Sequence, residues 1–315
     1  MATVGVGQVD VAFTPLLPGS VFVAEPAGAV LSYSFDEDGQ DTTSFRDTSP
    51  SRLNATCTGA SCPAIGRAGH SGSALWFDGV DDYLTVPNSA AINPGAAQDF
   101  TVALWVRPES IQPTATNSDS DVVEKWAGAD GYPYVIRYLN PGAGTDAGKI
   151  AVARYDGSGG PNPGIRSTKL VNDGRLHHVA FVKRGGTLAL YIDGQPDGET
   201  PDTTVAATTN TSALYIGRRG NGINSYAGLI DDLRIYGRGL SGDEIAALYA
   251  GAGPLLQLDF EDGWMTGGAT VTDQSGWQHD GVLDAGTGDT AGKAVTGQVG
   301  VHALSLDGVD DYVEV

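Results

Sequence analysis

The chain has 315 residues, and its 38 acidic side chains outnumber the 18 basic ones, which gives a net charge of −20 at pH 7. A charge of this sign repels a phosphate backbone, so nucleic acid is not an expected partner. No apolar run in the sequence is long enough to span a bilayer. The 45 glycines and 41% hydrophobic residues are typical of a globular, turn-rich protein built mostly of strands.

The first 27 residues are rich in glycine, proline and valine, and their short strand-like fragments are broken by LLPG and EPAG. We expect residues 1–27 to be the tail of a preceding module followed by a linker. Met1 is not followed by the basic and apolar regions of a signal peptide. The sequence is therefore expected either to start inside a longer, multidomain chain or to have had its signal peptide removed.

A domain is predicted to begin at residue 28 with a strand over residues 29–36. Leu31, Tyr33 and Phe35 alternate with polar residues, which is the pattern of a strand with one buried face. Cys57 and Cys62 follow, and no other ligands are spaced for a zinc site beside them. We expect these two cysteines to form a disulfide in an oxidising, extracellular setting.

The motif ALWFDGVDDYLTV at residues 74–86 returns as ALSLDGVDDYVEV at residues 303–315, with nine of thirteen positions identical. A separation of 229 residues indicates that a whole domain is repeated, not a short solenoid unit. An Asp-Gly turn lies between two apolar runs in each copy, so each copy is predicted to be a β-hairpin.

The rest of the chain predicts short strands and one helix. Ser241 and Glu244 form a capping box that starts the helix, and Gly251 ends it. Because the second copy stops at Val315, residues 28–252 are expected to form a complete domain and residues 253–315 the N-terminal part of a second one. The predicted strands are 100–108, 121–138, 149–155, 177–184, 187–193 and 227–236, with a hairpin turn at Arg184-Gly185-Gly186. This pattern predicts an all-β, antiparallel β-sandwich with one short C-terminal helix.

Five segments in the same order strongly resemble the laminin-G-like, concanavalin A-like jelly-roll family. The resemblance covers roughly residues 28–251 and then the opening of the second copy. It implies a jelly-roll sandwich whose first and last strands lie side by side, and a structural calcium ion in many relatives. The segments are SALWFDGVDDYLTVP, FTVALWVRP, GRLHHVAFVKRGGTLALYIDGQ, LYIGRRG and AGLIDDLRIYGRGLSGDEIAALYAG.

The resemblance brings Asp36, at the end of the first strand, near Asp231, at the start of the last. Asp231 shares a face with Leu229 and Leu233 if the strand alternates strictly, so we expect its carboxylate to be buried. A buried carboxylate needs a cation or hydrogen-bond donors.

Calcium, which takes oxygen ligands, would meet that need, and Asp47, Asp81 and Asp82 lie in loops that could supply further ligands. Salt bridges to Arg46 or Arg234, or hydrogen bonds to backbone amides, are the alternative.

Catalytic residues are not expected. Glucanases that share this sandwich carry carboxylates at alternate positions of one strand, and no such string occurs here. Glu124 has no second acid at that spacing, and Asp231 and Asp232 are adjacent, so they would point to opposite faces. For the same reason His177 and His178 cannot share a metal, and we expect one to be packed and the other exposed.

Glycan binding is the third possibility, because sugars are held by aromatic faces together with planar hydrogen-bonding side chains. Trp76 and Trp126 are the best candidates for exposed stacking, with Tyr132 and Tyr134 beside Trp126 in the sequence; Trp105 is expected in the core.

The sequence thus predicts a non-catalytic extracellular recognition or adhesion module that binds a glycan or a protein and holds a structural calcium ion. Two alternatives remain open: a spacer repeat of a surface protein, or an accessory domain of a secreted glycoside hydrolase.

Overall fold

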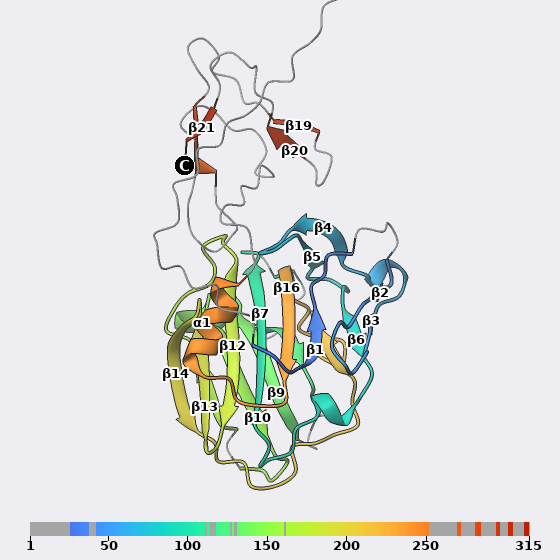
Figure 1. Ribbon diagram of the computed structural model, residues 1–315, viewed down its shortest axis with the longest axis vertical. Helices are drawn as coiled ribbons and strands as arrows, with labels where there is room; N and C mark the ends of the chain where they lie inside the picture. The colour runs from blue at the N-terminus through green and yellow to red at the C-terminus, as the bar shows by residue number, and fades with distance from the viewer. Residues whose placement is uncertain are drawn as a thin grey trace, which may run out of the picture.

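The computed structural model describes residues 26–251, with gaps at 38–41, 111, 114–117, 127, 129–130 and 161, and the backbone of five short strands between residues 270 and 314. Two antiparallel sheets of eight strands each pack into a sandwich over one large hydrophobic core (Figure 1). The predicted all-β sandwich with one short helix is confirmed. Among the described residues, no helix is long and apolar enough to cross a membrane.

The first sheet has the strand order β14-β13-β12-β7-β16-β5-β4, with β1 beside β16. Its hairpin β12–β13 turns where expected, with Arg184 opposite Thr187. The strands are β1 (Ala29–Tyr33), β4 (Ala64–Ala68), β5 (Ser73–Asp78), β7 (Phe100–Pro108), β12 (His177–Arg184), β13 (Thr187–Ile192), β14 (Gln195–Pro201) and β16 (Ala227–Tyr236).

The second sheet has the strand order β11-β10-β9-β8-β15-β6-β3-β2. The segment 121–138, predicted as strand, is two antiparallel strands, β8 and β9, joined by a loop. The strands are β2 (Ser44–Phe45), β3 (Ala55–Thr56), β6 (Leu84–Val86), β8 (Asp119–Glu124), β9 (Tyr132–Leu139), β10 (Ile150–Tyr155), β11 (Gly164–Arg166) and β15 (Leu214–Ile216). Short 3-10 helices lie at Gly59–Ser61, Ala90–Ile92 and Pro141–Asp146.

The first and last strands of the domain pair as the resemblance implies. β1 runs antiparallel to β16, with Leu31 opposite Ile235 and Tyr33 opposite Leu233. All four of these side chains lie in the core between the sheets, so this pairing closes the sandwich. The predicted disulfide between Cys57 and Cys62 is present, and the two Cα atoms are 5.1 Å apart.

The repeated motif at residues 74–86 is not a hairpin, and that prediction was wrong. β5 belongs to the first sheet and β6 to the second, so the Asp78-Gly79 turn carries the chain across the sandwich. Phe77 and Leu84 are both fully buried in the same core, which they enter from opposite sheets. Gly79 has φ of +74°, and a Cβ there would lie 2.6 Å from the Cβ of Ala227, so glycine is needed for the crossing.

Strict alternation also fails in β16. The register of β16 against β7 shifts between Asp231 and Arg234, and Asp232 has a φ of +49°. This β-bulge leaves Leu233 in the core but turns Leu229 to the outer side of the first sheet, beside Trp105. The expectation that Leu229 and Leu233 share a face was therefore wrong.

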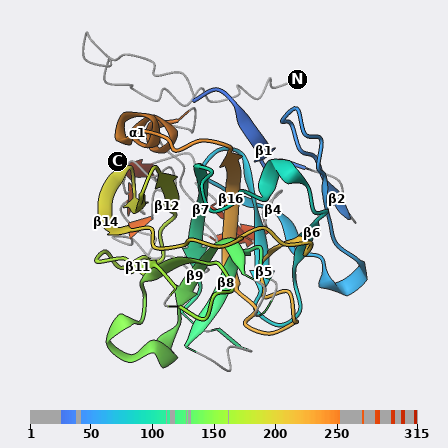
Figure 2. The ribbon, with the colours of Figure 1, turned by 90° about the horizontal axis from the view of Figure 1, so that it is seen from below.

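Helix α1 (Gly242–Ala250) covers the outer side of the first sheet, away from β8 and β9 (Figure 2). The capping box of Ser241 and Glu244 is confirmed. Ile245 and Leu248 are buried, and they pack in one cluster with Ala180 of β12. The helix thus shields part of the outer face of the first sheet from solvent.

Five short strands lie in the C-terminal segment: β17 (Thr270–Val271), β18 (Gly281–Asp284), β19 (Ala294–Thr296), β20 (His302–Leu304) and β21 (Tyr312–Glu314). Val282 pairs with Thr270 and with Glu314, as Thr56 pairs with Ser44 and with Thr85 in the first domain. The remaining residues of 252–315 and residues 1–25 lie outside the described part of the chain, so the predicted domain limits stay a prediction.

Candidate ligand-binding groove

An open groove of about 640 Å³ runs over β8, β9 and the end of β10, on the outer face of the second sheet. Arg137 marks that face, because its neighbours Ile136 and Tyr138 point into the core. The groove is lined mainly by polar groups. Its described lining residues are Ser118, Asp119, Trp126, Gly128, Tyr132, Arg137, Tyr155, Gly160, Asn162 and Arg219.

Two buried carboxylates lie beneath this groove because β8 carries a β-bulge. The register against β9 shifts between Asp121 and Val123, and Val122 and Val123 both face the core. Asp121 and Glu124, three positions apart, consequently both lie on the groove side. Strict alternation along the strand would place Asp121 and Glu124 on opposite faces, so this pair was not predicted from the sequence.

Two arginines span the carboxylates. Arg137 Nε donates to Asp121 Oδ1 at 2.7 Å and lies 3.6 Å from Asp119 Oδ2. Arg219 Nη2 lies 3.1 Å from Asp121 Oδ2 and 3.5 Å from Asp119 Oδ2, and Arg219 Nε is 3.6 Å from Glu124 Oε2. Each guanidinium therefore faces two or more carboxylates.

Glu124 is fully buried, and neither of its carboxylate oxygens meets a hydrogen-bond donor in the described part of the chain. Burial and the neighbouring Asp121 carboxylate raise the pKa of Glu124 well above its ordinary value. A protonated Glu124 can donate one hydrogen bond to Asp121, and the pair then carries a single negative charge, which lowers the cost of burying two neighbouring carboxyl groups.

The groove collects two of the four aromatic residues predicted to bind a ligand. Trp126 is half-buried, with the Arg219 guanidinium 5.6 Å from its ring centre. Tyr132 is almost wholly buried, and its hydroxyl accepts a hydrogen bond from Asn162 Nδ2 at 2.9 Å. Tyr155, which packs 5.9 Å from Tyr132, completes the aromatic wall.

The other two predicted aromatics lie elsewhere. Tyr134 is fully buried in the core and donates its hydroxyl proton to the carbonyl of Ile92 at 2.8 Å, so its ring cannot stack on an external sugar. Trp76 is half-buried on the outer side of the first sheet, with the Arg67 guanidinium 5.9 Å from its ring centre.

The predicted metal ligands Asp36 and Asp231 meet at one turn. Asp36 Oδ1 accepts from the amide of Ser73, and Asp231 Oδ2 accepts from the amide of His70. Asp231 is fully buried and its second oxygen takes the amide of Asp232. Burial above all, and the charges of Asp232 and Asp36, raise the pKa of Asp231 well above its ordinary value. Hydrogen bonds to backbone amides, one of the two alternatives, thus serve this carboxylate.

Asp47, the third predicted metal ligand, has hydrogen-bond donors of its own. It is fully buried, and its two oxygens accept hydrogen bonds from the amides of Ser32, Ser49 and Leu53 and from the Ser49 hydroxyl, at 2.8–3.0 Å. These four donors occupy the lone pairs that a cation would need. Asp47 fits the role of a loop organiser.

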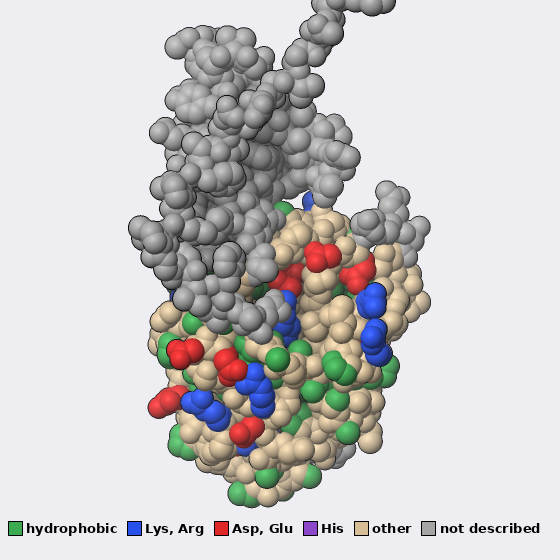
Figure 3. Space-filling view, viewed as in Figure 1, with side chains coloured by type: hydrophobic (Ala, Val, Ile, Leu, Met, Phe, Trp, Pro, Cys, Tyr) green, Lys and Arg blue, Asp and Glu red, His purple; other side chains and the backbone are tan. Residues whose placement is uncertain are grey.

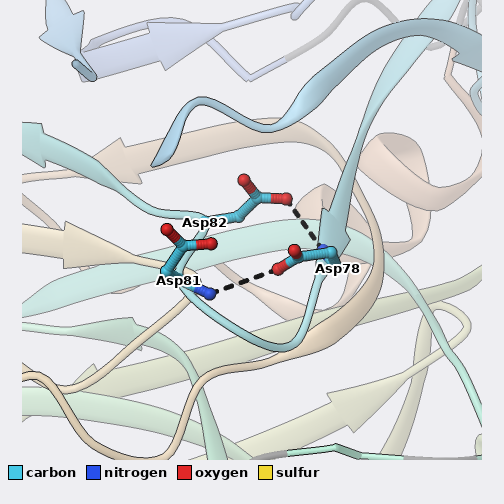
Figure 4. A group of neighbouring side chains, drawn as sticks. All are labelled: Asp78, Asp81 and Asp82. Carbon is cyan, nitrogen blue, oxygen red and sulfur yellow. Dashed lines mark hydrogen bonds between the residues drawn. The ribbon is translucent and has the colours of Figure 1, made fainter. Parts of the chain in front are cut away.

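Asp82 belongs to a different group, together with Asp78 at the end of β5 and Asp81 in the loop that leads to β6 (Figure 4). One carboxylate oxygen of each lies within 4.8 Å of the others. Burial first, and then the charges of Asp78 and Asp81, raise the pKa of Asp82 to about 6. Crowded carboxylates of this kind fit a hard divalent cation. The spacing D-G-V-D-D was the available signal, and it recurs as Asp307, Asp310 and Asp311.

Neither histidine of the His-His pair is exposed, so that expectation was wrong for one of the two. His177 bridges Asp193 and Asp173, with distances of 2.8 and 2.9 Å from its two ring nitrogens. His178 lies against Trp105 with ring centres 5.4 Å apart. Trp105 and Tyr249 of α1 cover His178 on the outer side of the first sheet, a face that strict alternation along the strand assigned to solvent.

Acidic and basic side chains are interspersed on the face that carries α1 (Figure 3). Among the described residues visible there, they form no continuous basic surface.

The chain belongs to the concanavalin A-like lectin/glucanases superfamily, since the laminin-G-type sequence profile of that description matches residues 78–246. A comparison with curated proteins finds no match.

Solved structures share the fold at low sequence identity. The binding domain of Paraclostridial mosquitocidal protein 1 is 15% identical with a TM-score of 0.59, covering 90% of this chain and 68% of that one. The binding domain of botulinum neurotoxin DC, in complex with rat synaptotagmin II, is 12% identical with a TM-score of 0.54, covering 84% and 68%. Trypanosoma rangeli sialidase, in complex with sialic acid, is 20% identical with a TM-score of 0.50, covering 75% of this chain and 35% of the enzyme.

Proposed function

We propose that the chain is a non-catalytic, extracellular carbohydrate-binding module whose ligand lies in the groove over β8, β9 and β10. The observation that carries this proposal is the combination, in one open groove, of the Trp126 ring face with fixed polar groups such as Asn162 and Asp119. Sugars are recognised by this pairing of an aromatic face with oriented donors and acceptors. The Cys57–Cys62 disulfide supports the extracellular setting.

The arrangement of the buried acids favours binding over hydrolysis. Glycosidases place two carboxyl groups on opposite sides of the scissile bond, roughly 5–9.5 Å apart and open to the substrate. Asp121 and Glu124 are both fully buried, and they are close enough for the charge of Asp121 to raise the pKa of Glu124. A sugar in the groove would meet Arg137 and Arg219 before it reached either acid.

Calcium belongs to the proposal as a structural ion. The carboxylates that fit it are Asp78, Asp81 and Asp82, and an ion there would hold the loop that joins the two sheets. The three carboxylates lie at the crossing and not in the groove lining, so the ion would stabilise the domain without touching the ligand.

A protein ligand is the second candidate, because a botulinum binding domain of similar fold is bound to synaptotagmin II. The groove favours a sugar, since its lining combines aromatic faces with many polar groups. Among the described residues, the large exposed hydrophobics (Val80, Leu170, Val205 and Ile223) lie outside it. Repeated copies of such a module would raise avidity in an adhesion protein.

A glycan array probed with the 315-residue chain tests the proposal, with hits measured by calorimetry. We expect Trp126→Ala to weaken binding at least tenfold. Trp76→Ala is the matched control, because Trp76 is also half-buried beneath an arginine but lies on the other sheet. No glycan binding by the wild-type chain, or equal loss in both variants, would overturn the proposal.

A further inference from the structure

Resting on the proposed function, we infer that the groove selects uncharged glycans and discriminates against sugars that carry a carboxylate, such as sialic and uronic acids. The inference departs from the ligand named for one fold relative, a sialidase in complex with sialic acid. It rests on the carboxylate partners that the guanidinium groups of Arg137 and Arg219 already have in the groove.

Proteins hold the carboxylate of an acidic sugar with cationic side chains, most effectively with arginine. Among the described residues that line the groove, Arg137 and Arg219 are the cationic ones. Arg137 is committed to Asp121 at 2.7 Å, and Arg219 to Asp121 at 3.1 Å. Asp121 is fully buried, so these ion pairs lie in a low-dielectric setting. Displacing Asp121 by the carboxylate of a ligand would leave a buried charge unpaired, at a large cost in free energy.

The balance of charge points the same way. Asp119, Asp121 and Glu124 set three carboxyl groups against two guanidiniums. With one proton on the Asp121–Glu124 pair the network is neutral, and without it the network is negative. Neither state offers net positive charge to an anionic ligand, and the net charge of −20 on the chain adds a repelling field.

The groups that remain available suit hydroxyls. Asp119 is part-exposed, with 18% of its side chain accessible, and it can accept a hydrogen bond from a sugar hydroxyl. Asn162 offers an amide, and Trp126 offers part of its ring face. Acceptors, an amide and an aromatic face together match a neutral hexose.

The test compares a neutral oligosaccharide that binds the wild-type chain with the same oligosaccharide bearing a terminal sialic acid or uronic acid. Calorimetry at about 50 and 300 mM salt separates contact from long-range repulsion. We expect the neutral member to bind at least tenfold more tightly at both salt concentrations. Equal or tighter binding of the acidic member overturns the inference and leaves the proposed function standing, whereas failure of both members to bind overturns the proposed function itself.

Asp119→Asn provides the second measurement, because it removes one carboxylate from both arginines and preserves the size of the side chain. We expect the preference for the neutral sugar to fall by about tenfold. Glu199→Gln is the control, since it changes the net charge equally at an exposed position of β14 outside the groove. An unchanged preference in Asp119→Asn, or an equal change in Glu199→Gln, contradicts the inference.

Discussion

Asp36, which follows the first strand of the sandwich, and Asp231, in the last strand, accept hydrogen bonds from the same turn, at the amides of Ser73 and His70 with distances of 2.8 and 2.7 Å. The turn joins β4 to β5, so three separate parts of the chain meet there. A Cβ at Gly69 would lie 2.3 Å from Asp231 Oδ2 and 2.9 Å from the backbone of Ser73. The turn therefore depends on the absence of a side chain at this position.

We expect Gly69→Ala to lower the free energy of unfolding by about 1–3 kcal/mol, because the buried Asp231 carboxylate has no room to withdraw. Urea denaturation measures the change. Gly186→Ala is the matched control: a Cβ there meets nothing within 4 Å, so its effect should stay within about 0.5 kcal/mol. Equal effects in the two variants would show that the turn tolerates a methyl group.

Periodicity predicted the faces of the regular strands and failed where a bulge interrupts them. In β7, Phe100, Val102, Leu104 and Val106 all reach the core, as strict alternation requires. In β8 and β16 the extra residue at a bulge reverses the alternation, and this places Glu124 beside Asp121 and takes Asp231 away from Leu233. A bulge depends on contacts between strands far apart in the sequence, so local pattern does not reveal it.

The candidate site was predictable only in part for the same reason. Trp126 and Tyr132 are close in sequence and lie together, but Arg219 joins them from a loop about ninety residues further on. Tyr134 is two positions from Tyr132, and yet it lies in the core. The aromatic residues between 126 and 134 pointed to this region, but only the pairing of β8 with β9 and β15 brings the arginines over the acids.

Tyr134→Phe separates a core role from a ligand-binding role. The variant removes the hydroxyl that donates to Ile92 and leaves that buried carbonyl without its partner, so we expect a loss of about 1–2 kcal/mol in the free energy of unfolding. Glycan affinity should be unchanged, because the ring lies between the sheets. A clear loss of affinity at unchanged stability would place Tyr134 at the ligand.

Calcium binding at Asp78, Asp81 and Asp82 predicts a concentration-dependent rise in thermal stability. At a free calcium concentration of about 100 times the dissociation constant, the gain is roughly 2.7 kcal/mol. We expect Asp81→Asn to reduce this gain, since it removes a carboxylate ligand. Because Asp81 is exposed, the substitution should change the stability of the calcium-free protein little. Melting curves with calcium and with chelator measure it.

Glu199→Gln is again the control for the lost charge, because Glu199 is exposed and lies outside the carboxylate group. A calcium response that is identical in wild type, Asp81→Asn and Glu199→Gln would remove these carboxylates from consideration as ligands.

The two adjacent histidines should titrate with opposite effects on stability. Burial lowers the pKa of His178 from 6.5 to about 3. As the pH falls below 6.5, the unfolded chain takes up a proton that the folded chain refuses, so stability falls by about 1.4 kcal/mol per pH unit. We expect His178→Phe, which keeps a ring against Trp105, to lack this slope between pH 6 and 5. Denaturant midpoints at these pH values measure the difference from wild type.

His177 supplies the opposite sign. Although its burial opposes protonation, Asp193 and Asp173 raise the pKa of His177 above 6.5. Its contribution to stability is complete below pH 6.5 and is lost as the pH rises through the folded pKa. His177→Gln should therefore flatten the alkaline side of the stability profile and leave the acid slope of His178 in place. An acid slope that disappears in His177→Gln and persists in His178→Phe would reverse the two assignments.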